Sequence, residues 1–298
     1  MHQCLVSVLQ NAHPSYEVIV VDQSSGHETR EIIRHMKDKR IRYRHSDQIG
    51  NTKALNEALS MARGDIYAFT DDDCIVPKKW LTKIEDVYLQ HPEVSGVSGQ
   101  TLPYTKTMPN DKSVCPGMYE SALKPRFVLS VGPTVHSPVS GFGKGTNMSF
   151  RKEVFIKIGG FKEWLGPGAM APGAGNETEF IYRAIKNKYI LYVRPDIIVL
   201  HDRWLTEHEA AHLIAIKVQG YTAFISYSII RHMDFRLFDG VFRFGRYFKQ
   251  IIFAAYRSFF FRKPLSPAEI YAYKMSSGVI RGVCIGLFFA VRDMFSLK

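Results

Sequence analysis

The chain has few cysteines, and their spacing carries no motif. Cys4, Cys74, Cys115 and Cys284 lie far apart and form no CxxC pair. Without such pairs the sequence suggests neither a zinc site nor a disulfide framework. We therefore expect a protein of a reducing compartment.

Long apolar runs are absent as well. No uninterrupted stretch reaches the ~18–20 apolar residues that a transmembrane helix needs. The nearest candidate, residues 279–291, is shorter and contains Arg281. The N-terminus also lacks the basic and apolar regions of a secretory signal peptide. These absences predict a cytoplasmic protein.

Acidic residues are in the minority. The chain has 39 Lys and Arg against 28 Asp and Glu, and its net charge is +11. Such an excess implies an anionic partner: nucleic acid, phosphates or membrane lipid. No DNA- or RNA-binding motif is visible, so we expect no nucleic acid. At 298 residues the chain can fold as one large domain or as one domain with an appendage.

Against this basic background, three consecutive aspartates, Asp71, Asp72 and Asp73, follow the apolar run 66–70. Adjacent carboxylates repel one another, and solvent, a helix N-terminus or a hard divalent cation usually compensates. In an extended chain Asp71 and Asp73 would point the same way, with Asp72 opposed. One aspartate could instead cap the helix predicted at 78–90, which would explain one carboxylate but not three. Both readings, a metal–nucleotide site and a cap, stay open at this point.

The first half alternates predicted strands and helices. The strands are 17–21, 41–44 and 66–70, and the helices are 28–37 and 51–62. This alternation is typical of an α/β domain with a largely parallel sheet. Ligands of such sheets bind beyond the carboxyl ends of the strands, where Asp22 and the three aspartates stand.

The middle of the chain is rich in glycine and proline. Residues 101–145 predict loops over a site, and the glycines of 141–145 lack the spacing of a phosphate loop. The stretch 166–175 predicts a functional lid or a mobile segment. After it, Asn176-Glu177-Thr178-Glu179 opens a predicted helix, either as an N-cap with two acids in the first turn or as a catalytic carboxylate.

In order and spacing, these segments resemble the inverting family 2 glycosyltransferases, which have the GT-A fold. Val20-Val21-Asp22 resembles the strand whose acid contacts the nucleotide base, and Phe69 to Asp73 resembles the DxD region. Gly175 to Glu179 falls where the family usually has Glu-Asp-x-Asp. The resemblance runs from about Cys4 to about Trp204. Further matches are Gly50, Ala54, Asn56, Ala62, Gly64, Asp65, Pro77, Trp80, Leu81, the stretches 145–151 and 159–161, and His201.

The resemblance implies a GT-A, Rossmann-like catalytic domain at 1–205, with a mostly parallel sheet flanked by helices, and a helical C-terminal region at 206–298. Glu177 would be the catalytic base. Glu179 would hold the helix end or contact the acceptor. Mg²⁺ or Mn²⁺ would be bound by Asp71, Asp73 and His201, and the nucleotide by Asp22, Ser24, Asn56, Asp71 and Asp72.

The implied activity is metal-dependent transfer of a sugar, with inversion, from a nucleotide-diphosphate sugar. The acceptor would be a hydroxyl of a glycan or lipid-linked molecule in cell-surface polysaccharide synthesis. One alternative is a nucleotidyltransferase, although the Gly-rich loop expected after its first strand is not visible. The other is a non-catalytic membrane-surface protein with a decayed transferase domain.

The chain departs from the family pattern in two places. The family normally begins with a strand of the type Val-Ser-Ile-Ile-Ile-Pro-Thr-Tyr-Asn, whereas this sequence starts at Met1, inside what would be the following helix. Loss of a central strand is expected to expose sheet edges and to remove base contacts. Asn176-Glu177 also stands in place of Glu-Asp. Glu177 can still act as a base, but Asn176 cannot titrate.

The last third is basic and aromatic. Residues 231–263 contain nine Phe, two Tyr and eight Lys or Arg against two acids. A packed core helix is one interpretation. The density of cations favours a helix in an anionic membrane interface, which would place the enzyme at the inner face of the cell membrane.

Overall fold

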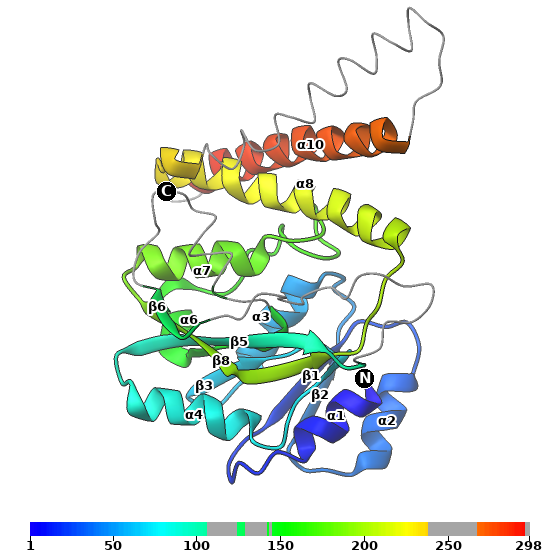
Figure 1. Ribbon diagram of the computed structural model, residues 1–298, viewed down its shortest axis with the longest axis vertical. Helices are drawn as coiled ribbons and strands as arrows, with labels where there is room; N and C mark the ends of the chain where they lie inside the picture. The colour runs from blue at the N-terminus through cyan, green and yellow to red at the C-terminus, as the bar shows by residue number, and fades with distance from the viewer. Residues whose placement is uncertain (106–123, 129–141, 143–144, 238–266, 296–298) are drawn as a thin grey trace, which may run out of the picture.

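The computed structural model describes residues 1–105, 124–128, 142, 145–237 and 267–295, with backbone alone at 267–272. The described chain is layered (Figure 1). Helices α1 (His2–Leu9) and α4 (Trp80–Gln90) lie on one side of a sheet, and α7 (Asn176–Lys186) lies on the other. Beyond α7 stack two long helices, α8 (Glu207–His232) and α10 (Pro267–Phe295). The predicted α/β class and C-terminal helices are confirmed.

The N-terminal half forms a parallel two-stranded sheet with its helices. Strand β1 (Val18–Asp22) pairs with β2 (Ile41–His45) in parallel register. Helices α2 (Glu28–Met36) and α3 (Asn51–Met61) follow these strands. All four elements begin and end close to the predicted bounds, because the apolar periodicity and the intervening turn residues mark them locally.

The second sheet has six strands, and it is mixed rather than mostly parallel. Its order is β3-β7-β5-β8-β4, with β6 paired to β8. Only the β5–β8 pairing is parallel in this sheet; β3–β7, β5–β7, β4–β8 and β6–β8 are antiparallel. Periodicity marks a strand but not its direction, so the sequence could not reveal that β7 runs against its neighbours. The bounds are β3 Ile66–Phe69, β4 Cys74–Ile75, β5 Val94–Pro103, β6 Arg126–Val128, β7 Met148–Arg151 and β8 Ile190–His201.

The two sheets are not joined within the described part of the chain. There β1 pairs with β2 alone, and β3 ends the six-stranded sheet with β7 as its partner. Among the described residues, β1 and β3 therefore each have one unpaired edge.

The core lies on both sides of the six-stranded sheet. One cluster joins α1 and α4 to the strands through Val8, Trp80 and Ile84. The other joins the strands to α6 (Lys152–Ile158), α7, α8 and α10. Trp164, in the loop after α6, stacks on Phe289 of α10 with ring centroids 4.6 Å apart. This second cluster continues across the predicted boundary after residue 205.

Helices α8 and α10 approach each other closely. A Cβ at Gly282 would lie 2.0 Å from Oγ1 of Thr222, and one at Gly286 would lie 2.1 Å from Oγ of Ser226. Glycine is therefore required where the two helices cross. By length and composition α8 could cross a membrane, a feature that the sequence interpretation missed. Yet 56% of its most apolar window is buried inside the protein, which is typical of a core helix too.

Candidate active site

The three aspartates lie at the end of β3, where β4 brings β8 beside them. The β4–β8 register places Cys74 opposite His201. As a result, Nε2 of His201 lies 3.1 Å from Oδ1 of Asp73, although 128 positions separate the two residues. Nη1 of Arg203 lies 3.9 Å from Oδ2 of Asp73. We call Asp71, Asp72, Asp73, His201 and Arg203 the aspartate edge.

Two carboxyl groups of the aspartate edge have opposite electrostatic environments. Burial raises the pKa of Asp73, but the hydrogen bond and charge of His201, with Arg203, outweigh it and hold that pKa below its ordinary value. The pKa of Asp71 is raised to about 6, first by desolvation and then by the negative charges of Glu177 and Asp73. Asp71 is at the same time an exposed residue, so solvent reaches its side chain. It is therefore a carboxylate short of positive charge.

A divalent cation fits these side chains. Ligand atoms of Asp73, Cys74 and His201 all lie within 4.8 Å of one another. Cys74 is fully buried, and burial followed by the charge of Asp71 raises its pKa to about 12, so its thiol keeps its proton. A carboxylate oxygen and an imidazole nitrogen remain, a donor set that suits Mn²⁺ and, through its oxygen, Mg²⁺. The structure thus brings two of the three predicted metal ligands together.

Glu177 comes to the same place from α7. Its half-buried carboxylate packs against Gly145, where a Cβ would lie only 2.6 Å from Oε1. Its charge is the second-largest cause of the raised Asp71 pKa. The charge of the predicted base therefore acts on the predicted metal site, although β7 and α6 lie between the two segments in sequence.

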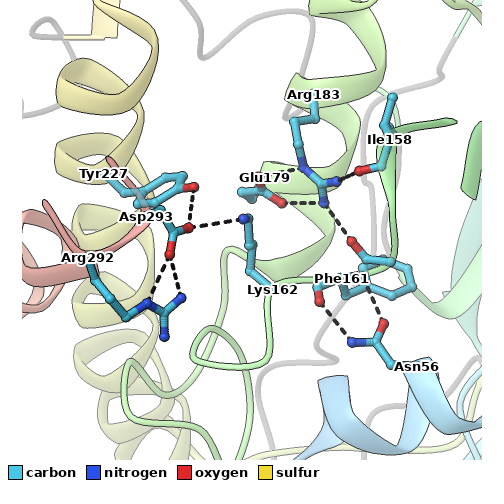
Figure 2. Close-up of polar contacts among 10 residues, drawn as sticks. Asn56, Ile158, Phe161, Lys162, Glu179, Arg183, Tyr227, Arg292 and Asp293 are labelled. Atoms are coloured by element: carbon cyan, nitrogen blue, oxygen red, sulfur yellow. Dashed lines mark hydrogen bonds and ion pairs between the residues drawn. The ribbon is translucent and has the colours of Figure 1, made fainter. Parts of the chain in front are cut away.

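Glu179, two residues later, has a different role. Its fully buried carboxylate accepts hydrogen bonds from Nε and Nη2 of Arg183, at 2.7 and 2.8 Å (Figure 2). Arg183 also donates to the carbonyls of Ile158 and Gly160. Of the two roles predicted for Glu179, these contacts support the structural one.

A second carboxylate in Figure 2 docks the helical pair. Oδ2 of Asp293 in α10 accepts from the hydroxyl of Tyr227 at 2.8 Å and from Nζ of Lys162 at 3.2 Å. Arg292 donates to Oδ1 of the same group. We call the Glu179–Arg183 pair and this Asp293 cluster the anchor network.

Asn176 does not cap α7, which was one of the two interpretations of this segment. The helix begins at Asn176 itself, and the N-cap is Gly175, whose φ of 107° favours glycine. The Asn176 side chain is fully buried, and neither amide atom has a hydrogen-bond partner among the described residues. A buried Gly166, with φ 107°, lies against it: a Cβ there would be 2.9 Å from the amide carbon.

The residues predicted to bind the nucleotide are engaged with their own surroundings. Asp22 accepts from the backbone and hydroxyl of Ser24, at 3.0 and 2.7 Å, and from the Tyr43 hydroxyl at 3.0 Å. Burial raises the Asp22 pKa, but these bonds outweigh it and hold the pKa low. Asn56 bonds the backbone of Phe161 through both ends of its amide (Figure 2). The nucleotide contacts expected for Asp22 and Asn56 stay predictions, as does the contact expected for the exposed Asp72.

The glycine-rich loop is packed at both ends. The backbone N–H of Asn51 donates to the Pro167 carbonyl at 2.9 Å, and a Cβ at Gly173 would lie 2.6 Å from the Ile216 carbonyl carbon in α8. Met170, near its middle, is exposed. Closure of this loop over a ligand stays a prediction.

Sequence reasoning missed Lys217. This half-buried lysine of α8 has Glu177, Arg203 and Asp71 as its electrostatic neighbours. A lone lysine inside an apolar helix carries no motif, so only the packing of α8 could reveal its position.

Comparison with known proteins gives a consistent result. The family model for glycosyl transferase family 2 matches residues 1–159. A Bacillus subtilis protein, TuaG, whose name assigns it to teichuronic acid biosynthesis as a glycosyltransferase, is 28% identical over 208 residues, covering 62% of this chain and 82% of TuaG. Other curated relatives are matched over as little as 10% of their length.

Two solved structures share the fold. The mannosyltransferase PcManGT of Pyrobaculum calidifontis, in complex with GDP-Man and Mn²⁺, aligns with a TM-score of 0.55 and 16% identity, over 99% of this chain and 70% of that one. TarS of S. aureus, residues 1–349 with UDP-GlcNAc, aligns with a TM-score of 0.50 and 18% identity, over 76% of this chain and 68% of that one. At these identities the likeness concerns the fold alone.

Proposed function

The chain belongs to glycosyl transferase family 2, and we propose that it transfers a sugar from a nucleotide-diphosphate sugar to an acceptor hydroxyl, with inversion at the anomeric carbon. One observation carries the proposal. Asp73 and His201 are in contact at the end of β3, and the charge of Glu177, from a third part of the sequence, acts on the neighbouring Asp71. A base beside an anion-and-metal site is what a single displacement at a sugar phosphate requires.

In this reaction Glu177 accepts the proton of the acceptor hydroxyl. The acceptor oxygen forms a bond to the anomeric carbon as the bond from that carbon to the phosphate oxygen breaks, and the nucleoside diphosphate leaves with the bonding pair. Asp73 and His201, with Asp71, would hold Mg²⁺ or Mn²⁺. When bound, such an ion neutralises charge on the diphosphate. Asp22, Ser24, Asn56 and Asp72 would contact the rest of the nucleotide.

The acceptor is proposed to be a glycan or a lipid-linked molecule of cell-surface polysaccharide, as the name of the Bacillus relative suggests. We propose that the enzyme works at the inner face of the cell membrane. Of the basic aromatic segment that first indicated this, residues 238–263 lie outside the described part of the chain.

The outer face of α10 supports membrane contact. Four large apolar side chains are exposed at seven-residue intervals: Tyr273 61%, Ile280 53%, Leu287 40% and Met294 52%. Exposed cations accompany them, namely Lys274, Arg281 and Arg292. An apolar stripe flanked by cations suits an anionic lipid surface. The double variant Ile280→Glu/Leu287→Glu should co-sediment less with phosphatidylglycerol vesicles than the wild type does. Equal binding by the variant and the wild type would contradict this contact.

Calorimetry with UDP, dTDP, GDP and CDP, and with the triphosphates, tests the proposed donor. We expect one diphosphate to bind in the presence of Mn²⁺ and only weakly without it. A preference for a triphosphate would favour the nucleotidyltransferase instead. Absence of binding by every nucleotide would favour a non-catalytic membrane-surface protein.

A further inference from the structure

Helices α7 and α8 run side by side in the same direction (Figure 1). A Cβ at Gly175, just before α7, would lie 3.0 Å from the Gly220 carbonyl oxygen. Further along, the rings of Tyr182 and Phe224 have centroids 5.7 Å apart. At the far end Nζ of Lys186 donates to the carbonyl of His232. The start of α7, which carries Glu177, therefore lies opposite the part of α8 near residue 220.

The turn of α8 that contains Lys217 is fixed against the loop before α7. Ile216 meets Gly173, and a Cβ at Gly220 would lie only 2.0 Å from the Ala174 carbonyl oxygen. Glycine at 173 and 220 thus lets the loop backbone touch α8 on both sides of Lys217. Such contact leaves the backbone little freedom to move and gives Lys217 a defined position at the candidate active site.

The surroundings of Lys217 are those of a ligand-binding cation. Desolvation lowers the pKa of Lys217. The negative charges of Glu177 and Asp71 act to raise this pKa, and the positive charge of Arg203 lowers it further. Within the described residues, no ion pair or hydrogen bond engages its ammonium group. Nε2 of His201 and Nη1 of Arg203 lie toward Asp73, whereas the ammonium group of Lys217 has no such carboxylate contact among the described residues and could engage a further anion.

We propose that Lys217 binds the diphosphate of the donor. The inference rests on the proposed function and adds a residue to it. A diphosphate brings further negative charge to an edge that already holds three aspartates and Glu177. An ammonium group donates charge-assisted hydrogen bonds to phosphate oxygens, and its charge opposes the charge that grows on the leaving group. Lys217 would therefore act on the donor side of the reaction, across from Glu177.

The test compares Lys217→Met with Lys217→Arg, and with Lys157→Met as a matched loss of an exposed lysine on α6. Calorimetry measures binding of UDP, GDP, CDP and dTDP, and of the monophosphates, in MnCl₂. Lys217→Met should weaken binding of the preferred diphosphate by about 10-fold or more, because a charged hydrogen bond is lost. Monophosphate binding should change less, Lys217→Arg should retain most of the affinity, and Lys157→Met should match the wild type.

Other outcomes overturn the inference in distinguishable ways. If the wild type binds a diphosphate and Lys217→Met binds it equally well, the proposed function stands and the inference fails. The same holds if affinity is unchanged but the pH profile of turnover shifts, because Lys217 would then act through Glu177. If the wild type binds no diphosphate, both fail together. Thermal unfolding checks each variant, and Lys217→Gln replaces Lys217→Met if the latter does not fold.

Discussion

The aspartate edge and the anchor network use the same residue types in opposite ways. In the anchor network each carboxylate has its own direct donors: Glu179 is paired with Arg183, and Asp293 with Lys162, Tyr227 and Arg292. Burial raises the pKa of Asp293, but the effect of those donors is larger and holds this pKa below its ordinary value. At the aspartate edge, desolvation first and then the like charges of Glu177 and Asp73 raise the pKa of the Asp71 carboxyl to about 6.

This difference separates groups that hold the fold from groups poised for a ligand. A buried carboxylate such as Glu179, whose donors are fixed within the protein, ties helices and loops together. A carboxylate crowded by like charge costs stability until a cation arrives, and such perturbed groups concentrate at functional sites. Glu179, paired with Arg183, belongs to the first kind, and Asp71 belongs to the second.

The largest expected effect is on turnover by Glu177→Gln. The amide keeps the shape but cannot accept the acceptor proton, so kcat should fall by about 10²–10⁴-fold, the range for loss of a general base. Donor binding and thermal stability should stay near the wild-type values. The measurement is release of nucleoside diphosphate from the preferred donor with Mn²⁺. Normal turnover would remove Glu177 as the base.

Glu179→Gln should have the reverse effects of Glu177→Gln, a loss of stability rather than a loss of kcat. It leaves the Arg183 guanidinium buried without its carboxylate, and breaking such a pair costs about 3–5 kcal/mol of unfolding free energy. Urea unfolding measures this loss, with Glu177→Gln as the matched control. If Glu179→Gln instead lowered kcat without lowering stability, Glu179 would belong to the acceptor site and the comparison would break.

A smaller effect is expected at Asn176, between the two regions. Its buried amide has no partner in the described structure, so Asn176→Leu should change the unfolding free energy by less than about 1 kcal/mol. Asn176→Asp brings a carboxyl group into the same place and should cost more, about 1–3 kcal/mol. Equal urea midpoints for the two variants would show that the side chain is hydrated or paired in solution.

The smallest effect is expected from Asp71→Asn in metal-free protein. Because the folded pKa of Asp71, about 6, lies above its ordinary 3.8, its ionisation costs stability above pH 6, and this cost is lost as pH falls toward 3.8. Asp71→Asn should therefore be more stable than wild type at pH 8, by about 1 kcal/mol or less for so accessible a group. The two should converge near pH 4. Thermal unfolding of both proteins in EDTA, from pH 4 to pH 8, measures this difference. An Asp71→Asn variant less stable than the wild type at pH 8 would contradict the raised pKa of Asp71.

Local patterns predicted local structure well. The aspartates after β3, the helix at Asn176 and His201 at the end of β8 follow from periodicity and resemblance. The sequence did not reveal that β4 would pair with β8, so the 3.1 Å contact of His201 with Asp73 could be expected only from the family. It missed Lys217 for a related reason, since its charged neighbours, Asp71, Glu177 and Arg203, come from three other segments. Strand direction and helix packing are set by tertiary contacts that single segments do not encode.

The central claim is that Asp73 and His201 hold a divalent ion together with a nucleoside diphosphate. Electron paramagnetic resonance of Mn²⁺ measures this directly, because the signal of the free ion falls as the ion is bound. We expect wild-type protein with the preferred diphosphate to remove one Mn²⁺ per chain from solution, and Asp73→Asn to remove far less than the wild type does. Equal uptake by Asp73→Asn and the wild type would contradict the claim.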